Sequence, residues 1–362
     1  MSNNKPVPTG KYAVGTMTYS VYGDRNIACR VYFPARKEDT EGLQKVVYMS
    51  YETCKGMNMI MPNPVSYKKI CKDGGNFSEC YEKAKPVPGE KFPLIIFNHG
   101  AGSFRESNSF LCIELASQGY VVICIGHPRF CACVELDNGT FEWPIKNLAF
   151  KTYKPYVKGA MKLIKLTKAE GTDEELADKL YQFQTVYCEM LLSEMPLWIE
   201  DTKRAVAYAK DNLSDMIDFS KGIGATGHSF GGAAAYILCH NEPEFACGIN
   251  IDGMTAGGFG EKVLEKPFLQ ICSDKTYKVV TRTHLYTNKP NYQVRFRDME
   301  HMGFCDLKYA LPMKSQVGAL PPDVLHEHLC KCHLEFFDAY LKGTKEAPDL
   351  NDDDAVKVTK YN

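Results

Sequence analysis

The residues that could do chemistry in this chain begin with a serine set between glycines. The motif reads Gly-His-Ser-Phe-Gly around Ser229, over residues 227–231. A strand-like apolar run precedes it, and a helix-like run of small residues, 233–238, follows it. In that context Gly-x-Ser-x-Gly forms a nucleophile elbow, a strained turn whose glycines avoid clashes while the serine hydroxyl is exposed. Ser229 is therefore predicted to attack an acyl carbonyl.

Such an attack creates an oxyanion, which needs hydrogen-bond donors. Residues 92–97 predict a short buried strand, which runs into the His-Gly-Ala-Gly loop of residues 99–102. A His-Gly-x-Gly loop follows the third strand of α/β-hydrolases and supplies one backbone N–H. We expect the N–H groups of Ala101 and Phe230 to form the oxyanion hole. An ordinary glycine turn after a strand is the alternative interpretation of residues 99–102.

The general base is predicted to be His301, on the loop after the strand-like residues 292–296, taken as the last strand of the sheet. This position fits the chain order Ser, acid, His of the α/β-hydrolases. The other eight histidines fit the role less well. Because the base must be neutral to accept a proton, activity should rise with pH through the range in which histidines titrate.

Two aspartates could orient this histidine. Asp252 closes the strand-like residues 247–251, and Asp274 follows the strand-like residues 268–273. Most α/β-hydrolases draw the acid from the later of these two strands, which would select Asp274, and some draw it from the earlier strand. The spacing alone leaves both residues open.

Taken together, these segments resemble the platelet-activating-factor acetylhydrolase family, in its plasma and type II forms. The resemblance covers roughly residues 10–36, 92–130 and 197–340, and includes the Asn-Ile-Asp-Gly sequence that contains Asp252. It implies an acid a short way past the serine, at the end of the sixth strand, and Asp252 lies 23 residues after Ser229. The resemblance therefore favours Asp252.

The fold class that follows is α/β, an α/β-hydrolase fold with a mostly parallel central sheet, helices on both faces and a helical cap. We expect one domain over residues 1–362, with a loop insertion at about 40–90 and a cap at about 131–196. A chain of this length, 44% of it hydrophobic, can bury a large core. The cap should contain helices over 157–168 and 174–193, the second capped by Thr172 or Asp173. A separate helix over 197–209 should lead to the elbow strand.

Composition limits the partners of the protein. A net charge of −1 offers no broad attraction to nucleic acid, and no apolar run approaches the ~20 residues of a membrane helix. The N-terminus has no apolar signal segment, so we expect a cytoplasmic protein, with export of a processed form left open. Fifteen cysteines cannot all pair and are scattered, which indicates buried thiols. A local Cys71–Cys80 bridge in an exported form is the alternative.

A metal site is the other alternative that the sequence raises. Helical spacing over residues 322–342 places His326, Cys330 and His333 on one face, which could bind zinc. A packed amphipathic helix explains the same pattern. We expect neither metal nor cofactor.

The predicted function is that of a serine hydrolase that cleaves a carboxylic ester through an acyl-enzyme. Ser229 would be the nucleophile, His301 the base, and Asp252 the group that orients the base. The partner would be a small acyl ester, such as a lipid or sterol ester, and the oligomeric state is left open. An acyltransferase or amidase could use the same triad. A silent binding protein is disfavoured by the complete set of residues.

Overall fold

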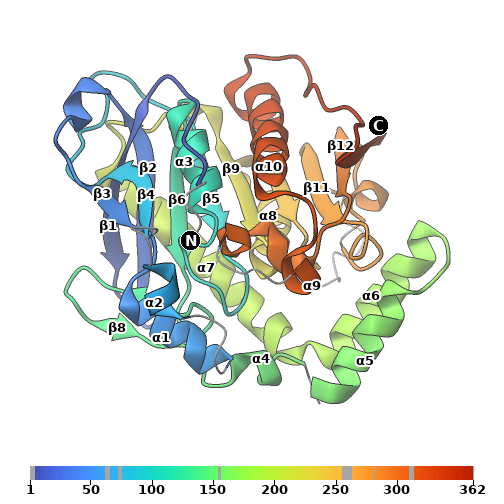
Figure 1. Ribbon diagram of the computed structural model, residues 1–362. Helices are drawn as coiled ribbons and strands as arrows, with labels where there is room; N and C mark the ends of the chain where they lie inside the picture. Colours follow the sequence, from blue (N-terminus) through green and yellow to red (C-terminus); the bar gives the residue numbers. More distant parts are fainter. Residues whose placement is uncertain are drawn as a thin grey trace.

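One large sheet organises the protein. The computed structural model describes residues 5–61, 66–71, 76–153, 156–254, 263–280, 282–309 and 314–361. Within these ranges an 11-stranded sheet has the order β13-β12-β11-β10-β9-β5-β6-β2-β1-β4-β3, and helices lie on both of its faces (Figure 1). The predicted α/β-hydrolase fold is confirmed in this arrangement.

Six parallel strands form the centre of the sheet. They are β5 (Leu94–Asn98), β6 (Val121–Gly126), β9 (Ile223–His228), β10 (Phe245–Ile251), β11 (Phe268–Ser273) and β12 (Asn291–Phe296). Most of their residues are buried, as expected for strands covered on both faces. Because parallel strands end at the same edge, the loops after β9, β10 and β12 come together there.

Antiparallel strands border this centre. The chain opens with the hairpin of β1 (Ala13–Val21) and β2 (Ile27–Ala35), and β2 pairs with β6. At the other edge β13 (Val356–Tyr361) pairs with β12. The expectation that residues 292–296 are the last strand is therefore wrong, although the alternating Val-Lys-Val-Thr of β13 is a strand signal.

Four helices form the main layers. On one face α3 (Ser109–Ser117) and α10 (Pro322–Phe337) pack on the sheet, and α10 continues as the π-helical turn η7 (Asp338–Lys342). On the other face lie α7 (Glu189–Asn212) and α8 (Phe230–Asn241), whose alanines permit close packing. The short helices are η1 (Glu38–Thr40), η3 (Phe219–Lys221), η4 (Thr283–Tyr286), η5 (His301–Phe304), η6 (Asp306–Tyr309) and α9 (Lys314–Val317).

The segment predicted as a loop insertion, residues 40–90, contains regular structure. It holds α1 (Tyr51–Ile60), α2 (Tyr67–Ile70) and two strands, β3 (Lys45–Val47) and β4 (Phe77–Tyr81), which extend the sheet beyond β1. The pattern is hard to see in the sequence because the buried positions of β4 are Ser78 and Cys80 rather than large apolar residues.

Residues 131–196 hold a small hairpin of β7 (Val134–Glu135) and β8 (Phe141–Glu142), the short α4 (Leu148–Lys151), and α5 (Tyr156–Thr167) with α6 (Asp173–Tyr187). The last two helices project together from the body of the molecule (Figure 1). Thr172 caps α6 in a reciprocal capping box with Glu175.

The predicted helix over 174–193 is wrong at its end. The chain breaks at Cys188, and α7 then runs without interruption through Pro196, which the sequence suggested as a boundary. A proline inside a helix removes one backbone hydrogen bond, and burial of Met195 and Trp198 beside it stabilises the helix there. No helix within the described ranges combines the length and apolar character needed to cross a bilayer.

Candidate active site

Ser229 lies at the turn between β9 and α8. Its backbone has φ 57° and ψ −120°, a conformation that is strained for a residue with a side chain. A Cβ on Gly231 would lie 2.0 Å from the backbone oxygen of Asn98, and a Cβ on Gly227 would lie 2.5 Å from the same atom. Glycine is therefore required at both positions because the turn packs directly against the end of β5.

Three loops bring Ser229, His301 and Asp252 into one hydrogen-bonded chain. His301 Nε2 lies 2.9 Å from Ser229 Oγ, and His301 Nδ1 lies 2.6 Å from Asp252 Oδ2. The Asp252 side chain is fully buried, whereas that of His301 is 39% exposed. In this geometry Nδ1–H donates to the carboxylate, which leaves Nε2 free to accept a proton from the serine.

Neighbouring residues hold the Asp252 carboxylate in place. The backbone N–H of Asp252 donates to the carbonyl of Ile271 at 2.7 Å. The Oδ1 atom of Asp252 accepts hydrogen bonds from the Ser273 N–H, at 3.2 Å, and from the Thr276 hydroxyl. Oδ2 is thereby directed to His301. Thr276 belongs to no motif, so its role could not be predicted from the sequence.

Asp274, the alternative acid, lies elsewhere. Its Oδ1 pairs with Arg295 Nε at 2.9 Å, and its side chain is 45% exposed. Of the two aspartates, the structure thus brings Asp252 to His301 and Asp274 to Arg295.

The expected oxyanion loop lies against the serine. A Cβ on Gly100 would lie 3.2 Å from Ser229 Cβ. The loop is held by hydrogen bonds from the Gly102 N–H to the Phe130 carbonyl, at 2.7 Å, and from the Ser103 N–H to the Gly100 carbonyl, at 3.0 Å.

The two predicted oxyanion donors make no hydrogen bond to another described residue. Among the described residues, no acceptor is hydrogen bonded to the N–H of Ala101 or of Phe230. Phe230 is the first residue of α8, where an N–H has no partner inside the helix and carries the positive end of the helix dipole. Both N–H groups can therefore donate to a bound oxyanion.

His228 supports the loop that carries the base. Its Nε2 donates to the backbone carbonyl of His301 at 3.0 Å. Burial, and then the neighbouring His301, lower the pKa of His228 to about 3. His228 therefore remains neutral at physiological pH and places no second positive charge beside His301 when that residue is protonated.

A buried polar network lies beneath the oxyanion loop. The His127 ring stacks on Trp198, with centroids 3.8 Å apart, and its nitrogens lie 3.0 Å from Asp201 Oδ2 and 2.8 Å from Asn98 Oδ1. Arg25 pairs with Asp201 from the far side at 2.9 Å. Trp198 is fully buried, as expected for a core residue. Sequence reasoning missed this network because its members lie on separate elements.

The proposed zinc face on α10 does not assemble as a ligand set. Both ring nitrogens of His333 are hydrogen bonded, to the hydroxyl of Thr226 at 3.0 Å and to the carbonyl of Leu329 at 2.7 Å. Among the three side chains of this face, His326 contacts only Cys330, with 3.5 Å between His326 Nε2 and the Cys330 sulfur. No group of three or more metal-binding side chains occurs in the part of the chain that the structure describes.

Apolar side chains from both insertions border the oxyanion loop. Ile60, at the end of α1, and Leu148, at the start of α4, lie 3.1 and 3.6 Å from the position of a Cβ on Gly102. The α5–α6 hairpin is attached further along the sheet edge, where Asp173 pairs with Arg282 at 3.0 Å and with His284 at 2.9 Å. The insertions are thus placed around the edge that carries Ser229.

Comparison with known proteins decides the family. The family model described as "Platelet-activating factor acetylhydrolase, isoform II" matches residues 2–285. The chain belongs to this family. The matched segment includes Ser229 and Asp252 and ends before His301, whose place in the site comes from the geometry alone.

Relatives in the family are distant. The platelet-activating factor acetylhydrolase of Gallus gallus is 28% identical over 237 residues, which cover 61% of this chain and 54% of that protein. That of Cavia porcellus is 25% identical over an alignment covering 96% of this chain and 80% of the relative. The matched part thus spans about half the length of the Gallus gallus protein, and likewise of those of Canis lupus familiaris and Bos taurus.

A solved structure has the same fold. The ferulic acid esterase from Streptomyces cinnamoneus superposes with a TM-score of 0.69 over 98% of both chains, at 17% sequence identity. At this identity the likeness concerns the fold.

Proposed function

We propose that the protein is a serine ester hydrolase that cleaves a carboxylic ester through an acyl-enzyme. The observation that carries the proposal is the hydrogen-bonded chain from Ser229 through His301 to the buried Asp252. Membership of the platelet-activating factor acetylhydrolase family supports it.

The proposed reaction uses each member of this hydrogen-bonded chain. His301 Nε2 takes the proton of Ser229 as Oγ attacks the acyl carbonyl, and Asp252 stabilises the charged imidazole. The N–H groups of Ala101 and Phe230 bind the oxyanion. His301 then gives its proton to the leaving alcohol, and a water molecule activated by the same histidine hydrolyses the acyl-enzyme.

The substrate is proposed to be a small acyl ester, of a lipid or of another alcohol. A pocket of about 630 Å³ lies between α4 and the start of α7, and Phe150 and Leu197 are among its lining residues. No residue of the triad or of the oxyanion loop lines it, and its link to the site is Trp198, which follows Leu197 and whose ring packs on Phe230 with centroids 4.8 Å apart. We place the acyl chain or the leaving group in this pocket, with residues 131–196 acting as the cap of a single catalytic domain.

The protein is further proposed to act in the reducing cytoplasm. All fifteen cysteines are free thiols, and fourteen of them are buried. The alternative Cys71–Cys80 bridge is absent, and the Cys71 sulfur instead accepts a hydrogen bond from Asn76 at 3.5 Å.

Rates on p-nitrophenyl esters of graded acyl length test the proposal. We expect saturable hydrolysis, and a changed ranking of acyl lengths in Phe150→Ala and Leu197→Ala, which alter exposed pocket side chains without loss of fold. Val157→Ala, on the exposed face of α5 outside this pocket, is the matched control and should keep the ranking. Turnover only in the presence of an added alcohol or amine would show an acyltransferase. An unchanged ranking in both pocket variants would refute the location of the acyl pocket.

A further inference from the structure

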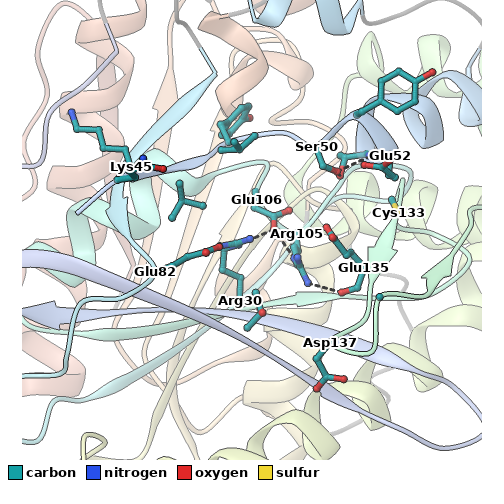
Figure 2. A pocket seen from close by; sticks show the side chains of 18 of the residues that line it. Arg30, Lys45, Ser50, Glu52, Glu82, Arg105, Glu106, Cys133, Glu135 and Asp137 are labelled. Carbon is teal, nitrogen blue, oxygen red and sulfur yellow. Dashed lines mark hydrogen bonds and ion pairs between the residues drawn. The ribbon is translucent and has the colours of Figure 1, made fainter. Parts of the chain in front are cut away.

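A second pocket lies at the antiparallel end of the sheet. It has a volume of about 1030 Å³ and is bordered by β1, β3, the start of α1 and the segment around β7 (Figure 2). Neither the triad nor the oxyanion donors line it. Tyr51 lines it at the start of α1, whereas Ile60, at the end of that helix, lies beside the oxyanion loop. Tyr51 and Ile60 lie nine residues apart on this helix, about 14 Å along its axis.

Two arginines in the wall of this pocket share one carboxylate. Arg30 Nε donates to Glu106 Oε1 at 3.0 Å, and Arg105 Nε donates to the same oxygen at 2.5 Å, as the dashed lines in Figure 2 show. The three side chains are nearly buried, with exposed fractions of 11%, 5% and 11% for Arg30, Arg105 and Glu106. The cluster therefore carries one net positive charge in a region of low solvent exposure.

Part of this cluster lacks a partner. Arg30 Nη1 is buried and has no hydrogen-bond partner among the described residues, and the same is true of the hydroxyl of Tyr48. Both residues line the pocket. A guanidinium group can only donate, and a phenol can donate, so the missing partner of each is an acceptor. Buried donors without acceptors are rare because each costs free energy.

We propose that this pocket binds an oxyanion, the carboxylate or phosphate group of a small molecule, against Arg30 and Tyr48. Arginine is the side chain best suited to such groups because its planar N–H array matches two oxygens at once. An oxyanion would balance the net charge of the cluster, and because Arg30 Nη1 and the Tyr48 hydroxyl have no solvent-accessible surface here, it supplies their missing acceptor only when these side chains turn toward the pocket. Four further carboxylates, those of Glu52, Glu82, Glu135 and Asp137, and two amines, those of Lys45 and Lys83, also border the pocket. The excess of carboxylates over amines favours hydroxyl or ammonium groups on the rest of the ligand rather than further negative charge.

Calorimetric titration of the full chain tests this site, with inorganic phosphate, acetate and phosphoethanolamine as probes and sodium chloride as the ionic-strength control. We expect at least one of the three oxyanions to bind and chloride to give no signal. Phosphate that binds without acetate identifies a phosphate site, and the reverse identifies a carboxylate site. Tighter binding of phosphoethanolamine than of phosphate would support the role of the acidic rim. No binding of any of the three probes would overturn the proposal.

Two substitutions at the cluster should act in opposite directions. Arg30→Gln removes the unpaired nitrogen and the net charge, and should weaken binding about tenfold or more. Glu106→Gln leaves both guanidinium groups and adds a positive charge, and should tighten binding. A residue of merely structural importance would weaken binding in both variants, and that outcome, or equal binding in Arg30→Gln and wild type, contradicts the proposal.

Two further variants separate binding from folding. Arg25→Gln changes another partly buried arginine, which pairs with Glu194 and Asp201 outside this pocket, and should leave binding unchanged. If Arg30→Gln fails to fold, Tyr48→Phe provides the test, because it removes a hydroxyl that bonds to no described residue. Weaker binding in a normally folded Tyr48→Phe supports the site, and unchanged binding contradicts it.

Discussion

Asp252 and Asp274 both end strands, but only Asp252 reaches His301. Asp252→Asn is predicted to lower kcat/KM by roughly four orders of magnitude, because an amide stabilises the wrong imidazole tautomer. Asp274→Asn, the matched control, should remain near wild type, since that carboxylate pairs with Arg295. The measurement is steady-state hydrolysis of the best p-nitrophenyl ester. Activity of Asp252→Asn comparable to that of wild type would refute the assignment.

The motifs predicted the three residues of the hydrogen-bonded chain and missed the residues that hold them in place. The Gly-x-Ser-x-Gly motif indicates the role of Ser229, and the position of His301 after a predicted strand indicates that of the histidine. The structure brings both residues together with Asp252. Thr276 and His228 act through single hydrogen bonds to residues that are distant in sequence. Such contacts depend on tertiary packing and leave no local pattern.

The elbow is the element on which the site depends, and glycine packing tests it. In Gly231→Ala the new Cβ would overlap backbone atoms of β5, with Asn98 O at 2.0 Å, so the turn must move. We expect a loss of about 3 kcal/mol in the free energy of unfolding, together with loss of activity. The control is Gly89→Ala, where nothing lies within 4 Å of the new Cβ and only the positive φ of 75° is unfavourable, and which should cost about 1 kcal/mol with activity kept. Urea denaturation of both variants provides the comparison, and equal losses would contradict the packing argument.

Element prediction succeeded where hydrophobic patterns were long and failed where tertiary contacts decide. The central strands and α10 carry continuous or periodic apolar residues and were placed correctly. The break at Cys188 and the passage of α7 through Pro196 depend on packing against the body of the protein. The strands β3 and β4 are short and their buried residues are small, so pairing with β1 rather than local propensity stabilises them.

At the scale of the whole molecule, buried histidines couple folding to pH. Burial lowers the pKa of His333 to about 4 and those of His99 and His228 to about 3, from an ordinary value of 6.5. Below pH 6.5 the unfolded chain binds protons that the folded chain does not, so the stability that these groups contribute at neutral pH is lost as pH falls toward 4.

The variant His333→Gln isolates one of these groups. Urea denaturation between pH 7 and pH 4.5 should show a shallower loss of stability in the variant, with a slope smaller by up to about 1.4 kcal/mol per pH unit. Asn241→Gln, which changes an exposed residue of α8 that does not titrate, is the control and should leave the slope unchanged. Identical slopes in wild type and His333→Gln would show that His333 is not held neutral by the fold.

The proposed activity depends first on the reactivity of Ser229, which can be measured without knowing the substrate. The purified chain would be incubated with a fluorophosphonate and its intact mass recorded, for wild type and for Ser229→Ala. We expect a mass increase of one phosphonyl group in wild type, none in Ser229→Ala, and loss of ester hydrolysis in the same variant. Unlabelled wild type, or equal labelling of both proteins, would contradict the assignment of Ser229 as the nucleophile.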